Sequence, residues 1–266
     1  MSFSPAERAE ARAVALAAAE EAGKILLGYL GRLERARIGT KSAARDLVTE
    51  ADLASERSVV ERLRRTFPAH AIESEEAVRD PHSSAPRWFL DPLDGTVNFV
   101  HCLPCFAVSI ALYVDGVPEV AVVHAPRLGE TFSAARGAGA FLDGERLQVS
   151  SCATLGEAIL ATGFPYRRAE LRPNNLENFQ ALFLDVRDLR RMGSAALDLA
   201  YVAAGRFDGF WELYLAPHDV AAGALLVREA GGRVSDLDGG EDWLRGGHLL
   251  AAGDVLHRAL RPRLVH

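Results

Sequence analysis

The sequence predicts a layered α/β protein whose sheets are mainly antiparallel (an α+β type of fold). Three observations support this. An alanine-rich segment near the N-terminus has the apolar periodicity of a long helix. Residues 105–149 predict an antiparallel meander, with hairpin turns at Asp115-Gly116 and Asp143-Gly144. The second half interleaves helices with short strands, and because the strands are mostly antiparallel we do not expect a doubly wound sheet.

The length and composition are those of a soluble globular protein. At 266 residues, with no stretch typical of a linker, we expect a single domain over 1–266, with approximate halves 1–150 and 151–266. Apolar residues make up 49% and charged residues 25% of the chain. The net charge of −6 gives no support for a nucleic-acid-binding surface.

The expected location is the cytoplasm. No apolar run approaches the roughly 20 residues that span a bilayer. Acidic and basic residues interrupt the N-terminal alanine-rich stretch, which is unlike a signal peptide. Three cysteines in a chain of this length fit a reducing compartment.

Two helices are predicted in the first 70 residues. Ser4 and Glu7 form a capping box around a proline, and the helix that follows runs to about Leu30. Thr49 and Asp52 form a second capping-box pattern at the start of the next helix. From this local pattern, Asp52 is equally typical of a carboxylate that only neutralises a helix N-terminus.

The stretch from residue 88 to residue 99 concentrates oxygen ligands. Trp88–Leu90 predict the end of a buried strand, and we expect the strand to break at Asp91-Pro92 because proline has no amide hydrogen. Gly95 lets the backbone approach a ligand closely. Carboxylate, carbonyl and hydroxyl oxygens suit Mg²⁺ better than Zn²⁺. The oxygen donors of this turn are Asp91, the Leu93 carbonyl, Asp94 and Thr96.

The same residues are also typical of a plain turn, since Asp-Pro-x-Asp-Gly is good turn chemistry. The apolar runs on either side, 88–90 and 106–112, favour the cation site. Like charges at the ends of buried strands repel one another unless a cation neutralises them. Just before this stretch, a short predicted strand ends in Glu75 and Glu76, which either form a solvated loop or supply another carboxylate to the same cation.

Cys102 and Cys105 are expected to be buried, inert thiols. Cys-x-x-Cys can be half of a zinc site, but the chain has no second pair, and Cys152 has no histidine at ligand spacing. The alternative is a redox-sensitive pair, if a turn at Pro104 brings the two sulfurs within disulfide range.

The second half adds an anion site and two acids. A helix that starts at Gly193-Ser194 presents free amides, which favour an anion. A strand ends in the acid Glu212, and Asp219 opens a helix, where an acid is also typical of a cap. We expect helices at 174–187, 194–204, 220–230 and 254–261, and strands at 158–162, 207–212, 233–236 and 248–252.

Together these motifs resemble the inositol monophosphatase family of Mg²⁺-dependent, lithium-sensitive phosphatases, over roughly residues 5–255. The resemblance implies a layered αβαβα sandwich. The chain departs from the family at Ser74, where glycine is usual, and at His218, where tryptophan is frequent. The matching motifs, in family order, are Asp46-Leu-Val-Thr49-x-x-Asp52, Glu75-Glu76, Asp91-Pro-Leu-Asp94-Gly-Thr96, Gly193-Ser194-Ala195, Glu212, and Asp219 with Gly223 and Gly231-Gly232.

The resemblance implies two to three Mg²⁺ ions. The first ion would be held by Glu75, Asp91 and the Leu93 carbonyl. The second would be held by Asp91, Asp94 and Asp219, and a third, weaker ion would lie near Glu75. In the implied mechanism, Thr96 and Asp52 orient and deprotonate a water, and Lys41 offsets the carboxylate charge. The implied catalytic residues are Lys41, Asp52, Glu75 and Thr96.

The resemblance also implies a small phosphorylated polyol as substrate, most specifically a myo-inositol monophosphate. A carboxylate that accepts two adjacent hydroxyls selects a polyol, and Glu212 occupies that position. Related enzymes act on histidinol phosphate, fructose bisphosphate, NADP or adenosine bisphosphate, and share the metal motifs. The implied substrate contacts are Gly95, Thr96, Gly193, Ser194, Ala195, Glu212 and Asp219.

For partners we expect a homodimer, no membrane and no nucleic acid. A hypothesis of a different class is that the chain is an interaction partner in transcription antitermination, as some bacterial relatives are. The complete set of metal-site motifs favours retained catalysis.

Overall fold

The computed structural model describes residues 3–33, 38–41, 47–81 and 85–266. Asp46, the first residue of the motif before the second helix, lies outside the described residues. None of the helices in these ranges is long and apolar enough to cross a membrane. The helices are α1 (Pro5–Tyr29), α2 (Glu50–Thr66), α3 (Thr96–Val100), α4 (Leu176–Phe183), α5 (Ala195–Ala203), α6 (Pro217–Glu229), α7 (Asp254–Leu260) and the short 3₁₀ helices η2 (Leu155–Glu157), η3 (Asp242–Leu244) and η4 (Arg261–Arg263).

The strands form two large sheets. A seven-stranded sheet has the order β3-β4-β5-β6-β7-β8-β9, and only its β3–β4 pair is parallel. A five-stranded sheet has the order β11-β10-β12-β14-β13. The strands are β1 (Gly39–Thr40), β2 (Leu47–Val48), β3 (Ala71–Ser74), β4 (Arg87–Asp94), β5 (Ala107–Val114), β6 (Val117–Ala125), β7 (Glu130–Ala135), β8 (Gly139–Leu142), β9 (Glu145–Arg146), β10 (Ile159–Thr162), β11 (Asp188–Arg190), β12 (Gly209–Leu213), β13 (Arg233–Ser235) and β14 (His248–Ala252).

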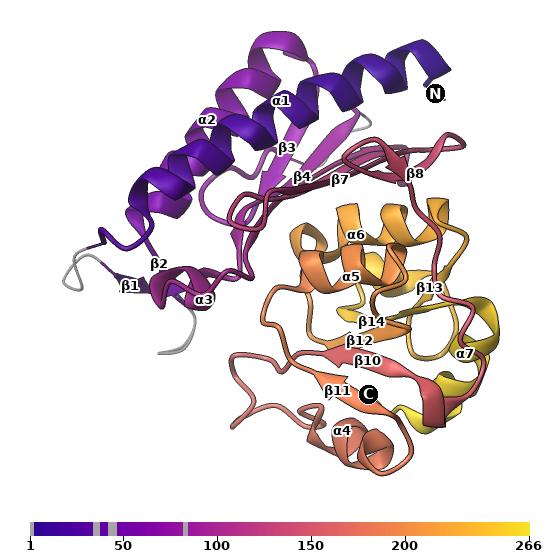
Figure 1. The fold of residues 1–266 in the computed structure, drawn as a ribbon. Helices are drawn as coiled ribbons and strands as arrows, with labels where there is room; N and C mark the ends of the chain where they lie inside the picture. Colours follow the sequence, from indigo (N-terminus) through magenta and orange to yellow (C-terminus); the bar gives the residue numbers. More distant parts are fainter. Residues whose placement is uncertain (1–2, 34–37, 42–46, 82–84) are drawn as a thin grey trace.

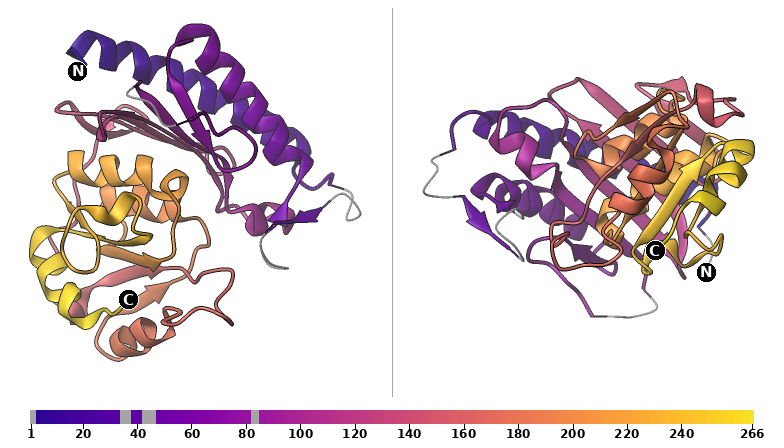
Figure 2. Two further views of the ribbon diagram at one scale, coloured as in Figure 1. Left: turned by 180° about the vertical axis from the view of Figure 1, so that it is seen from behind. Right: turned by 90° about the horizontal axis from the view of Figure 1, so that it is seen from below.

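The elements stack in alternating layers of helix and sheet (Figure 1). Helices α1 and α2 cover the outer face of the seven-stranded sheet, and Figure 2 shows them side by side from behind. Helices α5 and α6 lie between the two sheets, and α4 and α7 cover the far face of the five-stranded sheet. This arrangement confirms the predicted αβαβα sandwich with mainly antiparallel sheets.

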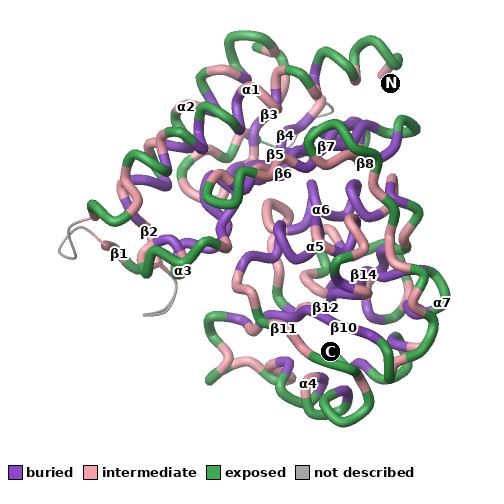
Figure 3. The backbone as a smooth tube through the Cα atoms, in the orientation of Figure 1, coloured by how far each residue is buried: buried purple, intermediate pink, exposed green. Residues whose placement is uncertain are grey.

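Alternating side chains give the seven-stranded sheet an apolar core on each face. Trp88 and Leu90 of β4 pack toward α1 and α2, whereas Phe89 between them packs toward α5 and α6. Successive residues of a strand point to opposite faces, so a strand covered on both sides is apolar throughout. Figure 3 shows the resulting buried residues in the central helices and strands, and exposed residues along the outer helices.

The predicted capping boxes and hairpin turns are confirmed. The Ser4 hydroxyl accepts a hydrogen bond from the Glu7 amide at 3.3 Å, and the Glu7 carboxylate accepts one from the Ser4 amide at 2.7 Å. In the β5–β6 turn, Asp115 and Gly116 both have positive φ, at 50° and 77°, as a two-residue hairpin requires.

Two predictions of the element boundaries were wrong. Strand β4 does not end at Asp91 but continues to Asp94, with an irregularity that skips the ladder pairs at Pro92 and Leu93. Proline is tolerated there because a bulge needs no amide donor. The predicted helix 174–187 is shorter, since α4 ends at Phe183, and the chain adds β11 in parallel with β10.

Candidate active site

The turn at the end of β4 brings its two acidic side chains to the boundary between the sheets. Asp91 and Asp94 are both buried, at 2% and 8% exposed. The Asp91 carboxylate accepts a hydrogen bond from the Leu93 amide at 3.0 Å, which fixes the turn. The Leu93 carbonyl accepts one from the Thr96 hydroxyl at 3.1 Å.

A third aspartate reaches the same place from a distant part of the chain. Asp219 lies in the first turn of α6, where its carboxylate caps the helix by accepting a hydrogen bond from the Ala216 amide at 2.6 Å. One carboxylate oxygen from each of Asp91, Asp94 and Asp219 lies within 4.8 Å of the others. The alternative interpretations, a plain turn and a simple cap, do not account for this convergence.

The group is electrostatically strained without a cation. Burial raises the pKa of Asp91 well above its ordinary value, and the charges of Glu75, Asp94 and Asp219 add to the effect. Burial, followed by the charge of Asp219, raises the pKa of Asp94 to about 7. Three carboxyl groups held this close suit a hard cation, which oxygen ligands bind well. The residues present therefore fit a Mg²⁺ site.

The start of α5 holds Asp94 in place. The Ser194 hydroxyl donates to one Asp94 oxygen at 2.5 Å, and the Ala196 amide donates to the same oxygen at 2.8 Å. The other Asp94 oxygen accepts no such bond from α5. Part of the anion site expected at Gly193-Ser194 is thus occupied by a carboxylate of the protein itself.

Two glycines allow the close approach of these segments. Gly95 has a φ of 92°, and a Cβ there would lie 2.8 Å from the Cys105 carbonyl oxygen and 3.2 Å from that of Gly193. Gly193 has a φ of 85°, and its Cβ would meet the Arg191 guanidinium at 2.6 Å. These contacts explain why glycine is required at Gly95, and its approach to a ligand stays a prediction.

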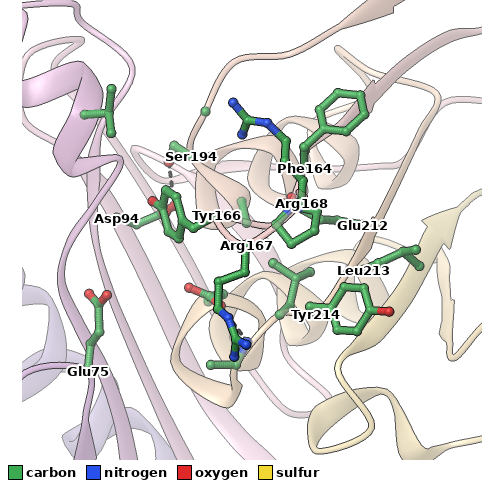
Figure 4. Close-up of a pocket in the computed structure, with 18 of the residues that line it drawn as sticks. Glu75, Asp94, Phe164, Tyr166, Arg167, Arg168, Ser194, Glu212, Leu213 and Tyr214 are labelled. Atoms are coloured by element: carbon green, nitrogen blue, oxygen red, sulfur yellow. Dashed lines mark hydrogen bonds between the residues drawn. The ribbon is translucent and has the colours of Figure 1, made fainter. Parts of the chain in front are cut away.

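Glu75 stands apart from the three aspartates. Its carboxylate forms an ion pair with the Lys41 ammonium at 2.7 Å, and Lys41 also pairs with Glu76 at 2.5 Å. Burial alone would lower the pKa of Lys41, but these two partners raise it above its usual range. Figure 4 shows Glu75 below Asp94 on the same side of the view, separated from it.

Asp52 and Thr96 form a second pair beside the metal group. The Asp52 carboxylate caps α2 by accepting from the Thr49 amide at 2.9 Å and the Thr49 hydroxyl at 2.6 Å. Its other oxygen lies 3.2 Å from the Thr96 hydroxyl. Burial raises the pKa of Asp52 to about 6, so this buried carboxyl can gain and lose a proton near neutrality.

A cavity of about 860 Å³ opens next to these groups. Glu212, from β12, faces it, and its carboxylate lies so close to Gly163 that a Cβ on that glycine would overlap it (Figure 4). Burial raises the pKa of Glu212 to about 8, against the opposing effect of Arg191. The predicted site residues that line the cavity are Lys41, Glu75, Asp94, Gly193, Ser194, Ala195, Glu212 and Asp219.

Sequence reasoning missed one acid of this cavity, Asp198. It lines the cavity from α5 and is 2% exposed. The sequence pattern that could have identified it is a single charged residue in the otherwise apolar segment Ala195–Ala203. Charged residues are seldom fully buried unless they have a partner.

The predicted burial of both thiols was wrong for Cys102. Cys102 is exposed, Cys105 is half-buried, and both are free thiols. Cys102 follows the short helix α3 and has a left-handed backbone conformation, with a φ of 58°.

His218, which replaces the more frequent tryptophan, lies beside the metal group. Its Nε2 atom is 3.8 Å from a carboxylate oxygen of Asp219.

Comparison with known proteins agrees with the fold. The model of the inositol monophosphatase family matches residues 7–266. The chain is 46% identical to Nus factor SuhB of Pseudomonas aeruginosa, over 93% of each chain. It resembles the inositol monophosphatase of Anabaena (Nostoc) sp. PCC 7120 with a TM-score of 0.86 and 40% identity, over 95% of this chain and 94% of that one. It also resembles inositol monophosphate-bound SaIMPase-II, with a TM-score of 0.79 and 28% identity over 94% and 91% of the two chains. The chain belongs to the inositol monophosphatase family.

Proposed function

We propose that this protein is a Mg²⁺-dependent phosphate monoester hydrolase that acts on an inositol monophosphate, giving myo-inositol and phosphate. One observation carries the proposal: Asp91, Asp94 and Asp219, from distant parts of the chain, converge within 4.8 Å. The inositol phosphate bound to a relative of 28% identity supports the substrate class.

Asp91, Asp94 and Asp219 would hold one Mg²⁺ ion, and Glu75, Asp91 and the Leu93 carbonyl would hold another, with a weaker third ion near Glu75. When bound there, Mg²⁺ supplies positive charge that stabilises phosphoryl transfer and makes water more acidic. For Glu75 to take part, its carboxylate must share its charge between the ion and Lys41, with which it is paired at 2.7 Å.

Asp52 and Thr96 would orient the attacking water. The Thr96 hydroxyl has two alternative acceptors, the Asp52 carboxylate at 3.2 Å and the Leu93 carbonyl at 3.1 Å. When it donates to Asp52, its oxygen can accept a hydrogen bond from the attacking water. A carboxyl with a pKa of about 6 accepts a proton from water well at neutral pH. Lys41 would offset the negative charge of the surrounding carboxylates.

The substrate would lie in the cavity between the two sheets. The amides of Gly95 and Thr96 would hold phosphate oxygens, and Gly193–Ala195 would contact the sugar beside them. Glu212 would accept hydrogen bonds from two neighbouring hydroxyls, which favours a polyol over a simple ester.

Phosphate release by the purified protein tests the proposal. We expect the highest kcat/KM with inositol 1-phosphate in a screen that includes histidinol phosphate, fructose 1,6-bisphosphate, NADP and adenosine 3′,5′-bisphosphate. Release should require Mg²⁺, stop in excess chelator and be inhibited by lithium. A kcat/KM for histidinol phosphate tenfold above that for inositol 1-phosphate, a difference of about 1.4 kcal/mol, would show that the proposed substrate is wrong.

A second candidate function rests on the relatives named Nus factor SuhB, which are 43–46% identical to this chain. By that similarity the protein would act as an interaction partner in transcription antitermination, with or without catalysis. The expectation that nucleic acid is no partner rested on net charge alone, and these relatives give it no support. Retention of the purified protein on an immobilised transcription complex, compared between the wild type and Asp94→Asn, separates this role from catalysis.

The proposed homodimer requires a separate measurement. Light scattering that gives twice the 28.7 kDa chain mass would support it, and the chain mass alone would contradict it.

A further inference from the structure

Asp198 is a buried acid with an unsatisfied oxygen at the wall of the cavity. It is the only charged residue of α5, whose other residues are apolar apart from the tyrosine Tyr201. The residue is 2% exposed and lines the cavity. Within the described part of the chain, its Oδ1 atom is buried and has no hydrogen-bond partner. A polar atom in this position is costly unless a ligand completes it.

Helix capping does not explain this side chain. An acid in the first turn of a helix is usually stabilised by the free amides there. In α5 those amides are taken by other groups, since Leu197 donates to the Ser194 hydroxyl and Ala196 donates to Asp94. Asp198 therefore occupies a helix start without serving as its cap.

Asp198 lines the same cavity as Glu212, the carboxyl group proposed above to bind the polyol hydroxyls. Burial raises the pKa of Asp198 well above its ordinary value, the charges of Glu212 and Asp94 raise it further, and Arg191 partly offsets them. Asp198 and Glu212 come from different elements, α5 and β12, and line the same cavity. Rotation about the last bond of an aspartate side chain is soft, so either oxygen can turn toward the cavity.

We propose that Asp198 is a second hydroxyl-binding carboxyl of this cavity and a determinant of substrate specificity. This inference rests on the proposed phosphatase function. A single carboxylate accepts hydrogen bonds from hydroxyls on one side of a polyol ring. Two carboxyl groups on separate elements can contact hydroxyls on different carbons of that ring. The cavity then selects a polyol phosphate with three or more hydroxyls, and an ester without them leaves the Asp198 oxygen unpaired.

Two variants of Asp198 test the proposal against a matched control. Asp198→Ala removes the acceptor, and Asp198→Asn keeps the shape and one oxygen acceptor. Asp254→Asn is the control, because Asp254 is also an acid in the first turn of a helix but is exposed and paired with Arg258. The quantity measured is the ratio of kcat/KM for inositol 1-phosphate to kcat/KM for phenyl phosphate.

We expect Asp198→Ala to lower this ratio at least tenfold, mainly through a higher KM for inositol 1-phosphate, and Asp198→Asn to stay within threefold of the wild type. The control should keep the wild-type ratio. An Asp198→Ala protein that loses both activities in equal proportion, or that keeps the ratio within twofold, would overturn the proposal, because a structural role predicts those results.

Calorimetric binding of inositol 1-phosphate, with Ca²⁺ in place of Mg²⁺, distinguishes failure of the proposed phosphatase function from failure of the proposed role of Asp198. If the wild type binds the ligand but hydrolyses neither ester, the proposed function fails, and a tenfold weaker Kd in Asp198→Ala still supports the role of Asp198. If the wild type hydrolyses phenyl phosphate but neither binds nor hydrolyses inositol 1-phosphate, the role of Asp198 is overturned while the phosphatase remains.

Discussion

The site consists of carboxyl groups that folding removes from water. Burial raises the pKa of Asp52 to about 6, of Asp94 to about 7 and of Glu212 to about 8. A buried carboxylate is costly unless a cation or hydrogen bonds compensate it. The protein therefore holds these acids at the expense of its stability, as is frequent at catalytic sites.

The pH dependence of stability follows from these shifts. A carboxyl whose pKa is higher in the folded state binds its proton more tightly there, so stability is highest below the unfolded pKa and falls as the pH rises toward the folded pKa. For Asp52, Asp94 and Glu212 the window runs from about 4 to about 8. We expect the Tm in chelator to fall between pH 5 and pH 8, and to fall less in Mg²⁺. Scanning calorimetry at matched ionic strength measures this, and a rising Tm in chelator would contradict the pKa shifts.

Asp219→Asn should separate the metal site from the fold. The amide oxygen of asparagine can still accept from Ala216, so the start of α6 should remain capped. The lost negative charge should weaken Mg²⁺ binding at least tenfold and lower kcat at least a hundredfold. Circular dichroism checks the fold, and a variant with normal Mg²⁺ dependence would remove Asp219 from the metal site.

Gly163→Ala tests the placement of Glu212. The added Cβ would overlap the Glu212 carboxylate and displace it from the cavity wall. We expect kcat/KM for inositol 1-phosphate to fall at least tenfold relative to phenyl phosphate. Gly156→Ala is the matched control, because its nearest atom is 4.0 Å away. Equal effects of the two alanines on the ratio would mean that Glu212 does not contact the substrate.

At the scale of the elements, the active site depends on the close contact between the β4 turn and the segment that leads into α5. Gly95→Ala should destabilise the protein by about 2 kcal/mol or more, because the left-handed conformation is strained and the backbone oxygens 2.8 and 3.2 Å away cannot move aside. Gly116→Ala, also at positive φ but with no described atom within 4 Å, should lose only about 1 kcal/mol. Urea unfolding of both variants measures the difference, and equal losses would contradict the packing argument.

Local signals predicted most element boundaries. The capping boxes at Ser4 and Thr49 and the hairpin at Asp115-Gly116 depend on residues three or fewer positions apart, so the sequence displays them directly. Strand β11 has only three residues and is defined by its parallel pairing with β10, which no local pattern reveals.

The candidate site was only partly predictable, because it also depends on contacts between residues far apart in the sequence. The motifs identify Asp94 as a candidate metal ligand, but its bonds to Ser194 and Ala196 join residues about 100 positions apart. The pairing of Glu75 with Lys41 and the unsatisfied oxygen of Asp198 likewise depend on tertiary packing. The sequence therefore indicates which atoms can bind a cation, and the fold determines which of them meet.

At the scale of the whole molecule, the acidic group lies where the two sheets and the helices between them meet. Asp91 and Asp94 belong to the seven-stranded sheet, whereas Asp219 belongs to α6. A cation bound between them links parts of the chain far apart in sequence. A ligand that binds only the folded state raises the free energy of unfolding with the logarithm of its concentration once that concentration exceeds Kd.

Titration of Mg²⁺ into chelator-treated, dialysed protein, followed by calorimetry and by Tm, tests the metal site most directly. We expect saturable binding and a Tm that rises with the Mg²⁺ concentration. In Asp94→Asn we expect an Mg²⁺ affinity at least tenfold weaker and a correspondingly smaller rise in Tm at the same Mg²⁺ concentration. Absence of Mg²⁺ binding by the wild type, or equal binding by Asp94→Asn, would contradict the central claim that the converging aspartates form the metal centre of a phosphatase.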